Sequence, residues 1–243
     1  MKSKIYIITF LLTATSFAFS QSLMNYQGGS SVDVQAGADI CADSVIMLGT
    51  FTGAGTICGF NQITLSLNAI IEGFYNSSSN TMVSDTVKIY LRSQDSPYAL
   101  VDSSAGILDN SGAGLFYFPN TVKSANYFIV VKQRNSIETW SDSAIAFTSV
   151  TAAHNFTTSA AQAYGDNMIQ VDASPVRFAI YSGDVNQDGI VDATDLSLVD
   201  NDASNFVTGE YVITDLNFDQ VVDGVDAVFS DNNASNFVTR QAP

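Results

Sequence analysis

Two stretches near the C-terminus place oxygen-bearing side chains at the spacing that a hard cation requires. The first runs from Asp184 to Asp195 and the second from Asp215 to Asp226. In each, Asp or Asn occupies positions 1, 3, 5, 9 and 12 of a twelve-residue loop, and position 7 can offer its backbone carbonyl. Ca²⁺ takes about six to eight oxygen ligands, and this spacing wraps them around one point. The sequence therefore predicts two calcium-binding loops.

The two loops belong to an internal duplication. Both copies begin with Asp-x-Asn-x-Asp, and both later contain the hexapeptide Ala-Ser-Asn-Phe-Val-Thr, at 203–208 and at 234–239. Identity at matching positions over this length indicates a repeated structural unit. Solvated Asp-rich turns, the alternative, would not require two copies in register.

The elements that position the loops are predicted to be short helices. A helix-compatible stretch follows each loop, over 194–203 and 225–234, with apolar residues of the first on one helical face. Asn205 and Asn236 suit the left-handed residue that ends a helix. Each copy is therefore expected to consist of a loop, a helix and a residue that ends the helix.

This arrangement resembles the dockerin module of secreted and cell-surface bacterial proteins. EF-hand loops end in Glu and follow a helix, whereas both loops here end in Asp and the first directly follows a strand-like segment. The resemblance covers residues 184–238. It implies two Ca²⁺ sites that fold the module and a cohesin-like or other exported protein receptor as the partner.

The resemblance also implies a ligand set for each ion. The first set is Asp184, Asn186, Asp188, the Ile190 carbonyl, Asp192 and Asp195; the second is Asp215, Asn217, Asp219, the Val221 carbonyl, Asp223 and Asp226. Position 6 is Gly189 in the first loop and Gln220 in the second. Because glycine tolerates the backbone angle needed there, we expect the second site to be weaker.

The chain is strongly acidic, with 24 Asp and Glu against 9 Lys and Arg and a formal net charge of −15. Such a charge repels nucleic acid and anionic membrane surfaces, so neither is expected as a partner. Half of the acidic residues, 12 of the 24, lie after Gly183, where Arg240 is the only basic residue. This concentration favours local cation binding.

Residues 1–20 have the composition of a secretory signal peptide. Lys2 and Lys4 precede an apolar stretch from Ile5 to Phe19, and small residues lead to Ser20. The stretch is too short for a membrane span. The sequence predicts cleavage near Ser20 and a bacterial protein that is secreted or held at the cell surface, without membrane insertion.

Residues 21–60 are rich in Gly, Ser and Thr and hold both cysteines, Cys41 and Cys58. In an exported protein an even number of cysteines favours a disulfide. The bridge would stabilise the fold by roughly 3 kcal/mol; a pair of buried free thiols is the alternative. One strand is expected at 44–48, and the run 50–56 is expected to form a turn-rich hairpin.

Residues 61–183 are predicted to form a β-sandwich domain. Val87, Ile89 and Leu91 alternate with polar or aromatic residues, as in a strand with one buried face. Further strand candidates, separated by polar turns, are 63–71, 115–118, 127–132, 144–148 and 176–181. The pattern resembles immunoglobulin-like or prealbumin-like sandwiches. The fold class is therefore mainly β: an antiparallel β-sandwich followed by a small helical, duplicated calcium-loop module at 184–243.

Residues that could catalyse a reaction are few. The single histidine, His154, lies in a strand-like segment, and the sequence holds no nucleophile elbow, phosphate loop or zinc-ligand spacing. Glu72 and Glu138 could act as the two carboxylates of a glycosidase, but the domain is small for that reaction. We expect no enzymatic activity.

The single tryptophan, Trp140, has two interpretations. An exposed ring could stack on a sugar, or the ring could fill the sandwich core. A sugar contact would make the protein a carbohydrate-binding accessory of a polysaccharide-degrading assembly. Otherwise it is a non-catalytic exported protein whose dockerin-like tail mediates docking or surface display of the sandwich, or a protein in which calcium only stiffens the tail.

Overall fold

The computed structural model describes residues 23–26, 31–35, 39–41, 44–47, 50–52, 56–58, 62–119, 122–149 and 151–243. The chain divides into two compact units, 1–60 and 61–243. The predicted signal peptide, 1–20, lies outside the described residues. Among the helices that are described, none combines the length and the apolar character needed to cross a bilayer.

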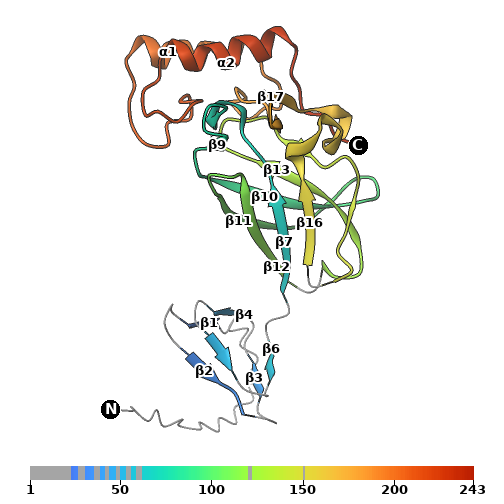
Figure 1. Cartoon of the computed structure of the whole chain (residues 1–243). Helices are drawn as coiled ribbons and strands as arrows, with labels where there is room; N and C mark the ends of the chain where they lie inside the picture. The colour runs from blue at the N-terminus through green and yellow to red at the C-terminus, as the bar shows by residue number, and fades with distance from the viewer. Residues whose placement is uncertain are drawn as a thin grey trace, which may run out of the picture. The chain divides into compact units, whose positions relative to one another are not determined.

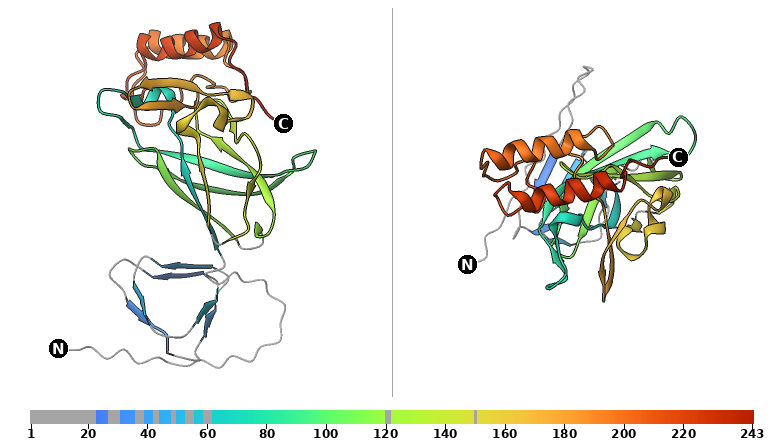
Figure 2. Two further views of the ribbon diagram at one scale, coloured as in Figure 1. Left: turned by 45° about the vertical axis from the view of Figure 1, so that its right-hand side comes forward. Right: turned by 90° about the horizontal axis from the view of Figure 1, so that it is seen from above.

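The first unit contains three pairs of parallel strands. β1 (Leu23–Tyr26) pairs with β4 (Ser44–Met47), β2 (Ser31–Asp33) with β5 (Thr50–Thr52), and β3 (Asp39–Cys41) with β6 (Thr56–Cys58). Three consecutive strands thus pair in order with the next three. The chain follows two turns of a three-sided parallel coil (Figure 2), as in the solenoids called β-helices.

This pairing confirms one prediction and corrects another. The strand expected at 44–48 is present as β4. The hairpin expected over 50–56 is wrong, because β5 and β6 each pair with an earlier strand and not with each other. The β3–β6 register also places Cys41 opposite Cys58. Neighbouring strands lie about 4.8 Å apart, which a disulfide can span; the bridge itself stays a prediction.

The second unit begins with two sheets whose apolar faces meet. The first sheet has the order β11-β10-β13-β14, with β15 paired to the start of β13, and the second has the order β12-β7-β16. All these pairings are antiparallel except that of β16 with β7. The strands are β7 (Gln62–Asn68), β10 (Asp85–Ser93), β11 (Leu100–Leu108), β12 (Ala113–Pro119), β13 (Asn126–Lys132), β14 (Thr139–Trp140), β15 (Ile145–Ala146) and β16 (Thr151–Asn155).

Alternating side chains of these strands build the core between the sheets. Val87, Ile89 and Leu91, predicted to share a buried face of β10, are at most 1% exposed. The second sheet contributes alternate residues of β7 and β12 to the same cluster: Ile63, Leu65, Leu67, Phe116 and Phe118. The alternation of apolar residues that predicted a sandwich therefore supplies the side chains that fill the space between its two sheets.

Short elements join the sandwich to the C-terminal module. They are the 3₁₀ turns η1 (Glu72–Phe74), η3 (Phe156–Thr158), η4 (Ala160–Gln162) and η5 (Tyr164–Asp166), the hairpin of β8 (Tyr75–Asn76) with β9 (Thr81–Met82), and the hairpin of β17 (Ile169–Ala173) with β18 (Val176–Ala179). The strand expected at 176–181 is present as β18, which leads within a few residues to the first predicted calcium loop.

Two helices follow the two loops, α1 (Ala193–Ser204) and α2 (Gly224–Ser235). The residue after each last turn differs from the prediction: Asn205 has φ −93°, and the left-handed residue is Phe206, with φ 53°. The second copy behaves in the same way. The reason is that each Asn side chain donates to the carbonyl four residues earlier, which keeps the Asn in the last helical turn.

The module shares its apolar core with the sandwich. Val191 and Val238 belong to the same buried cluster as the residues between the two sheets. A second cluster lies beneath the helices and comprises Val185, Val199, Leu216 and Val222. Residues 61–183 and 184–243 accordingly form one compact unit, with α1 and α2 side by side across one end of the sandwich (Figures 1 and 2).

Candidate metal centre

The first residue of the first loop is a buried carboxylate. Asp184 is 1% exposed; its Oδ2 accepts a hydrogen bond from the Gly189 amide at 3.2 Å, and its Oδ1 is buried without a hydrogen-bond partner. Burial, together with the nearby charges of Asp195 and Asp188, raises the pKa of Asp184 to about 6. A buried carboxylate oxygen that lacks a donor is stabilised by a cation.

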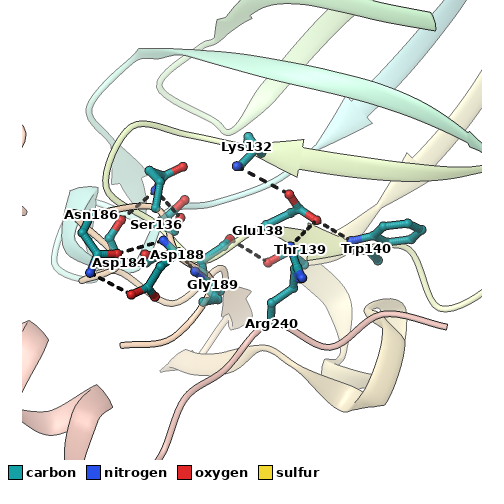
Figure 3. A network of polar contacts seen from close by, with 12 residues as sticks. Lys132, Ser136, Glu138, Thr139, Trp140, Asp184, Asn186, Asp188, Gly189 and Arg240 are labelled. Atoms are coloured by element: carbon teal, nitrogen blue, oxygen red, sulfur yellow. Dashed lines mark hydrogen bonds and ion pairs between the residues drawn. The ribbon is translucent and has the colours of Figure 1, made fainter. Parts of the chain in front are cut away.

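Short side-chain turns fold the rest of the first loop. Asn186 Oδ1 accepts from the Asp188 amide at 2.8 Å, and Asp188 Oδ1 accepts from the Ile190 amide at 2.9 Å. Asn186 Nδ2 also donates to Asp188 Oδ2 at 2.9 Å (Figure 3). Gly189 has φ +91°, the region that glycine adopts without strain. Positions 3, 5 and 6 therefore take the conformations that their residue types favour.

Asp195 closes the loop at position 12. Its Oδ1 accepts from the amides of Val185 and Asn186 at 2.9 and 3.1 Å, and its Oδ2 accepts from the Asp192 amide at 3.0 Å. Asp192 Oδ1 accepts from the Thr194 amide at 2.7 Å, so the two carboxylates form a capping box at the start of α1. Burial raises the pKa of Asp195. Two predicted ligands thus also cap the helix.

The second loop repeats this closure. Asp226 Oδ1 accepts from the amides of Leu216 and Asn217 at 2.7 and 3.2 Å, and its Oδ2 accepts from the Asp223 amide at 2.9 Å. Asp223 in turn caps α2 through the Val225 amide at 2.7 Å. Burial raises the pKa of Asp226 as well. The turns at Asn217 and Asp219 match those of the first copy.

The loops differ at positions 1 and 6. Asp215 is fully buried, but its Oδ1 accepts from the Phe218 amide at 2.6 Å and its Oδ2 from the Gln220 amide at 2.9 Å. Both of its oxygens have donors, unlike those of Asp184. Gln220 has φ 72°, a strained value for a residue with a side chain. These differences agree with the prediction of a weaker second site, which stays a prediction.

Each loop pairs with the segment that follows the other helix. Ile190, at position 7 of the first loop, forms an antiparallel bridge with Thr239 after α2, and Val221, at position 7 of the second, forms one with Thr208 after α1. In the first bridge the hydrogen bonds run from Val191 N to the Val238 carbonyl and from Arg240 N to the Gly189 carbonyl. The two copies are therefore interlocked.

The oxygen atoms of the two loops suit a hard cation, but the carboxylates of a loop are too few and too far apart to hold a metal ion by themselves. Within the described residues, no three His, Cys, Asp or Glu side chains are gathered closely enough to hold a metal ion. The other predicted ligands are the side-chain oxygens of Asn186 and Asn217 and the carbonyls of Ile190 and Val221. An all-oxygen set suits Ca²⁺ rather than a metal that prefers nitrogen or sulfur.

Sequence reasoning missed the residues that seat the module on the sandwich. Asn135, in the connection between β13 and β14, is fully buried and donates from Nδ2 to the Asp215 carbonyl at 2.9 Å. Glu72 Oε2, considered above as a catalytic carboxylate, accepts from Asn233 Nδ2 of α2 at 2.7 Å. Burial raises the pKa of Glu72. No local pattern marks these residues, because their partners are distant in sequence.

Trp140 lies in neither of its two expected settings. It is 6% exposed and packs beside Phe128 and edge-on to Tyr98, in an apolar cluster separate from the core between the sheets. Its Nε1 donates to Glu138 Oε1 at 2.8 Å (Figure 3). The ring therefore packs on the outer face of β13, whose core face carries Ile129, and is not presented to a sugar.

The other candidate catalytic residues also have structural contacts. Glu138 pairs with Lys132 at 3.5 Å and with Arg240 at 3.7 Å, which links the sandwich to the end of the module (Figure 3). His154 is 8% exposed, and its Nε2 lies 3.0 Å from the Gln162 carbonyl. Burial lowers the pKa of His154.

Comparison with known proteins assigns no family. No family model matches the chain, and no curated protein matches it. Among solved structures, a chain from a mutant type II cohesin–X–dockerin complex of Acetivibrio cellulolyticus is similar, with 14% identity, a TM-score of 0.38, and coverage of 72% of this chain and 99% of that chain. Similarity at this level establishes neither fold nor function.

Proposed function

We propose that residues 184–243 form a calcium-binding docking module, through which an exported protein receptor holds this chain and its β-sandwich. The observation that carries the proposal is the buried, unpartnered Oδ1 of Asp184. It lies at position 1 of a twelve-residue oxygen pattern that recurs in register at 215–226. A protein retains such an oxygen at a cost in stability unless a cation offsets it.

Cation binding to a loop would also stabilise the helix that begins in that loop. Bound calcium would supply positive charge to a loop that carries four carboxylates. Asp192 and Asp195 belong to the loop and also cap α1, and Asp223 and Asp226 do the same for α2. Ordering a loop therefore orders the start of its helix, so that calcium acts as a ligand that stabilises the folded module.

The outer side of the helix pair supports docking to a protein. Val228 of α2 is apolar and yet 54% exposed. A shallow groove lies between the helices and is lined by Leu196, Asp200, Gly224, Ala227, Val228 and Asp231. A groove that combines an exposed apolar side chain with carboxylates suits a protein interface. It favours a receptor that carries basic residues around an apolar centre.

Calorimetric titration of the full chain tests calcium binding. We expect two bound ions per chain, and loss of the tighter one in Asp184→Ala. Asp102→Ala, which changes an Asp of β11, is the matched control and should leave both sites intact. Heat changes that are identical in wild type and Asp184→Ala would contradict the proposed site.

Affinity capture from exported proteins of the source organism tests docking. The full chain is the bait, in calcium and in chelator, with Val228→Glu as a second bait. A receptor that is retained by the wild type in calcium, released by chelator and not retained by Val228→Glu would support the proposal. Calcium binding without any partner of this behaviour would show that calcium only braces the fold.

A further inference from the structure

A three-residue segment of the sandwich contacts both calcium loops. Arg134, Asn135 and Ser136 follow β13 and precede β14, and Asn135 and Ser136 are fully buried. We call residues 134–136 the coupling segment. Its contacts reach positions 1 and 4 of the second loop, and position 4 and the residue directly before position 1 of the first loop.

The coupling segment holds the second loop through two side chains. Asn135 Nδ2 donates to the carbonyls of Ile213 and Asp215, at 3.1 and 2.9 Å, and Asp215 is position 1. The Arg134 guanidinium lies 4.8 Å from the ring centre of Phe218, at position 4. The rings of Phe74 and Tyr211 lie within 5.1 and 5.4 Å of the same guanidinium. Such cation–π contacts strengthen when the cation is partly removed from water.

The same segment holds the first loop through its backbone. The Asn135 carbonyl accepts from the Gly183 amide at 2.8 Å, directly before Asp184. The Ser136 carbonyl accepts from Gln187 Nε2, at position 4, at 3.1 Å. Gln187 Nε2 also donates to the Asp184 carbonyl at 2.7 Å, so positions 1 and 4 are held together.

We infer that residues 134–136 couple the two calcium sites to each other and to the β-sandwich, so that the ions bind cooperatively and stabilise the sandwich as well as the module. This inference rests on the proposed calcium binding. Its physical basis is that an ion bound at position 1 orders its whole loop, including the position-4 residue that contacts residues 134–136. The ordered loop fixes the coupling segment, and the coupling segment then holds the other loop in place. The second ion consequently binds a loop that is already ordered.

The main test is Asn135→Ala in the full chain, with calcium binding measured by calorimetry. This change removes both hydrogen bonds to the second loop and leaves the Asn135 carbonyl in place. We expect the apparent affinity of both sites to fall, by about tenfold at the second, as the loss of buried hydrogen bonds implies. Asn126→Ala is the matched control, because Asn126 is exposed on β13 and its side chain bonds to Gln94 of the sandwich.

Thermal unfolding followed by Trp140 fluorescence provides a readout within the sandwich. Calcium should raise the midpoint in the wild type and in Asn126→Ala, and should raise it less in Asn135→Ala. If Asn135→Ala fails to fold, Asp215→Ala replaces it: coupling predicts that disabling the second loop weakens the remaining site in the first.

The outcomes separate the inference from the function on which it rests. A wild type that binds no calcium would overturn both. A wild type that binds two ions, with affinities unchanged in Asn135→Ala or a first site unchanged in Asp215→Ala, would overturn only the coupling. Weakening of both sites by Asn135→Ala, and not by Asn126→Ala, would support it.

Discussion

Gly73 of the sandwich lies directly against the backbone carbonyl of Leu216, the second residue of the second predicted calcium loop. A Cβ atom on Gly73 would collide with that oxygen and would lie 3.3 Å from Ser182 Oγ. A carbonyl in the backbone cannot rotate away as a side chain can. We therefore expect Gly73→Ala to destabilise the 61–243 unit by about 1 to 3 kcal/mol, measured by denaturant unfolding.

Gly224→Ala is the matched control for this change. A Cβ atom at Gly224 would meet nothing within 4 Å, and the residue opens α2, where alanine is favourable. The free energy of unfolding of the Gly224→Ala variant should equal that of the wild type or exceed it slightly. An equal loss in both variants would show that the Gly73 contact with Leu216 is not the cause.

The left-handed backbone at Gln220 predicts that the second calcium site can be improved. Gln220→Gly should relieve strain of about 1 kcal/mol, which corresponds to roughly fivefold tighter binding at that loop. Calorimetric titration would resolve the change, and Gly189→Gln should weaken the first site in return. Equal affinity of the two loops in the wild type, unaltered by Gln220→Gly, would contradict the argument.

The buried imidazole of His154 predicts a loss of stability in mild acid. Burial holds its pKa below the value of about 6.5 expected in the unfolded chain. The unfolded chain therefore takes up the proton first, so that this contribution to stability is complete above pH 6.5 and is lost as the pH falls.

A nuclear magnetic resonance titration would check this directly, because the chain has one histidine and so one imidazole to follow. The midpoint should lie below 6.5. Unfolding of His154→Gln should depend less on pH between 7 and 5 than unfolding of the wild type does. A midpoint at or above 6.5 would rule the explanation out.

The parallel register of β3 and β6 predicts a disulfide between Cys41 and Cys58. Peptide mapping of the unreduced protein should recover the two cysteines in one cross-linked peptide. Their replacement by serine should destabilise the first unit by roughly 3 kcal/mol. Alkylation of both thiols in the denatured, unreduced protein would show that no bridge forms.

The two Asp-rich turns and the helices that begin within them could be predicted because their information is local, whereas calcium binding by these turns stays a prediction. The ligand spacing, the Asp caps and the glycine at position 6 all lie within the twelve residues of one loop. The strand at 85–93 was equally accessible, since Val87, Ile89 and Leu91 alternate along it. β11 was missed because its centre, Ser103 to Gly106, has no apolar alternation; the strand is defined by its register with β10.

The packing of the C-terminal module on the sandwich could not be predicted from local sequence patterns. The contacts of Asn135 with Asp215 and of Glu72 with Asn233 join residues far apart in the sequence. Amide and carboxylate side chains such as these are common on surfaces, so their types carry no signal of burial. The parallel pairing in residues 23–58 was missed for the same reason, because each strand pairs beyond its sequence neighbours.

The bridge between Ile190 and Thr239 also sets the order in which the two loops can be completed. In a chain that emerges from a ribosome or a secretion channel N-terminus first, Thr208 is already outside when the second loop appears. The first loop must wait for residues 238–240, although it emerges earlier. The copy that comes first in the sequence is therefore the last to close.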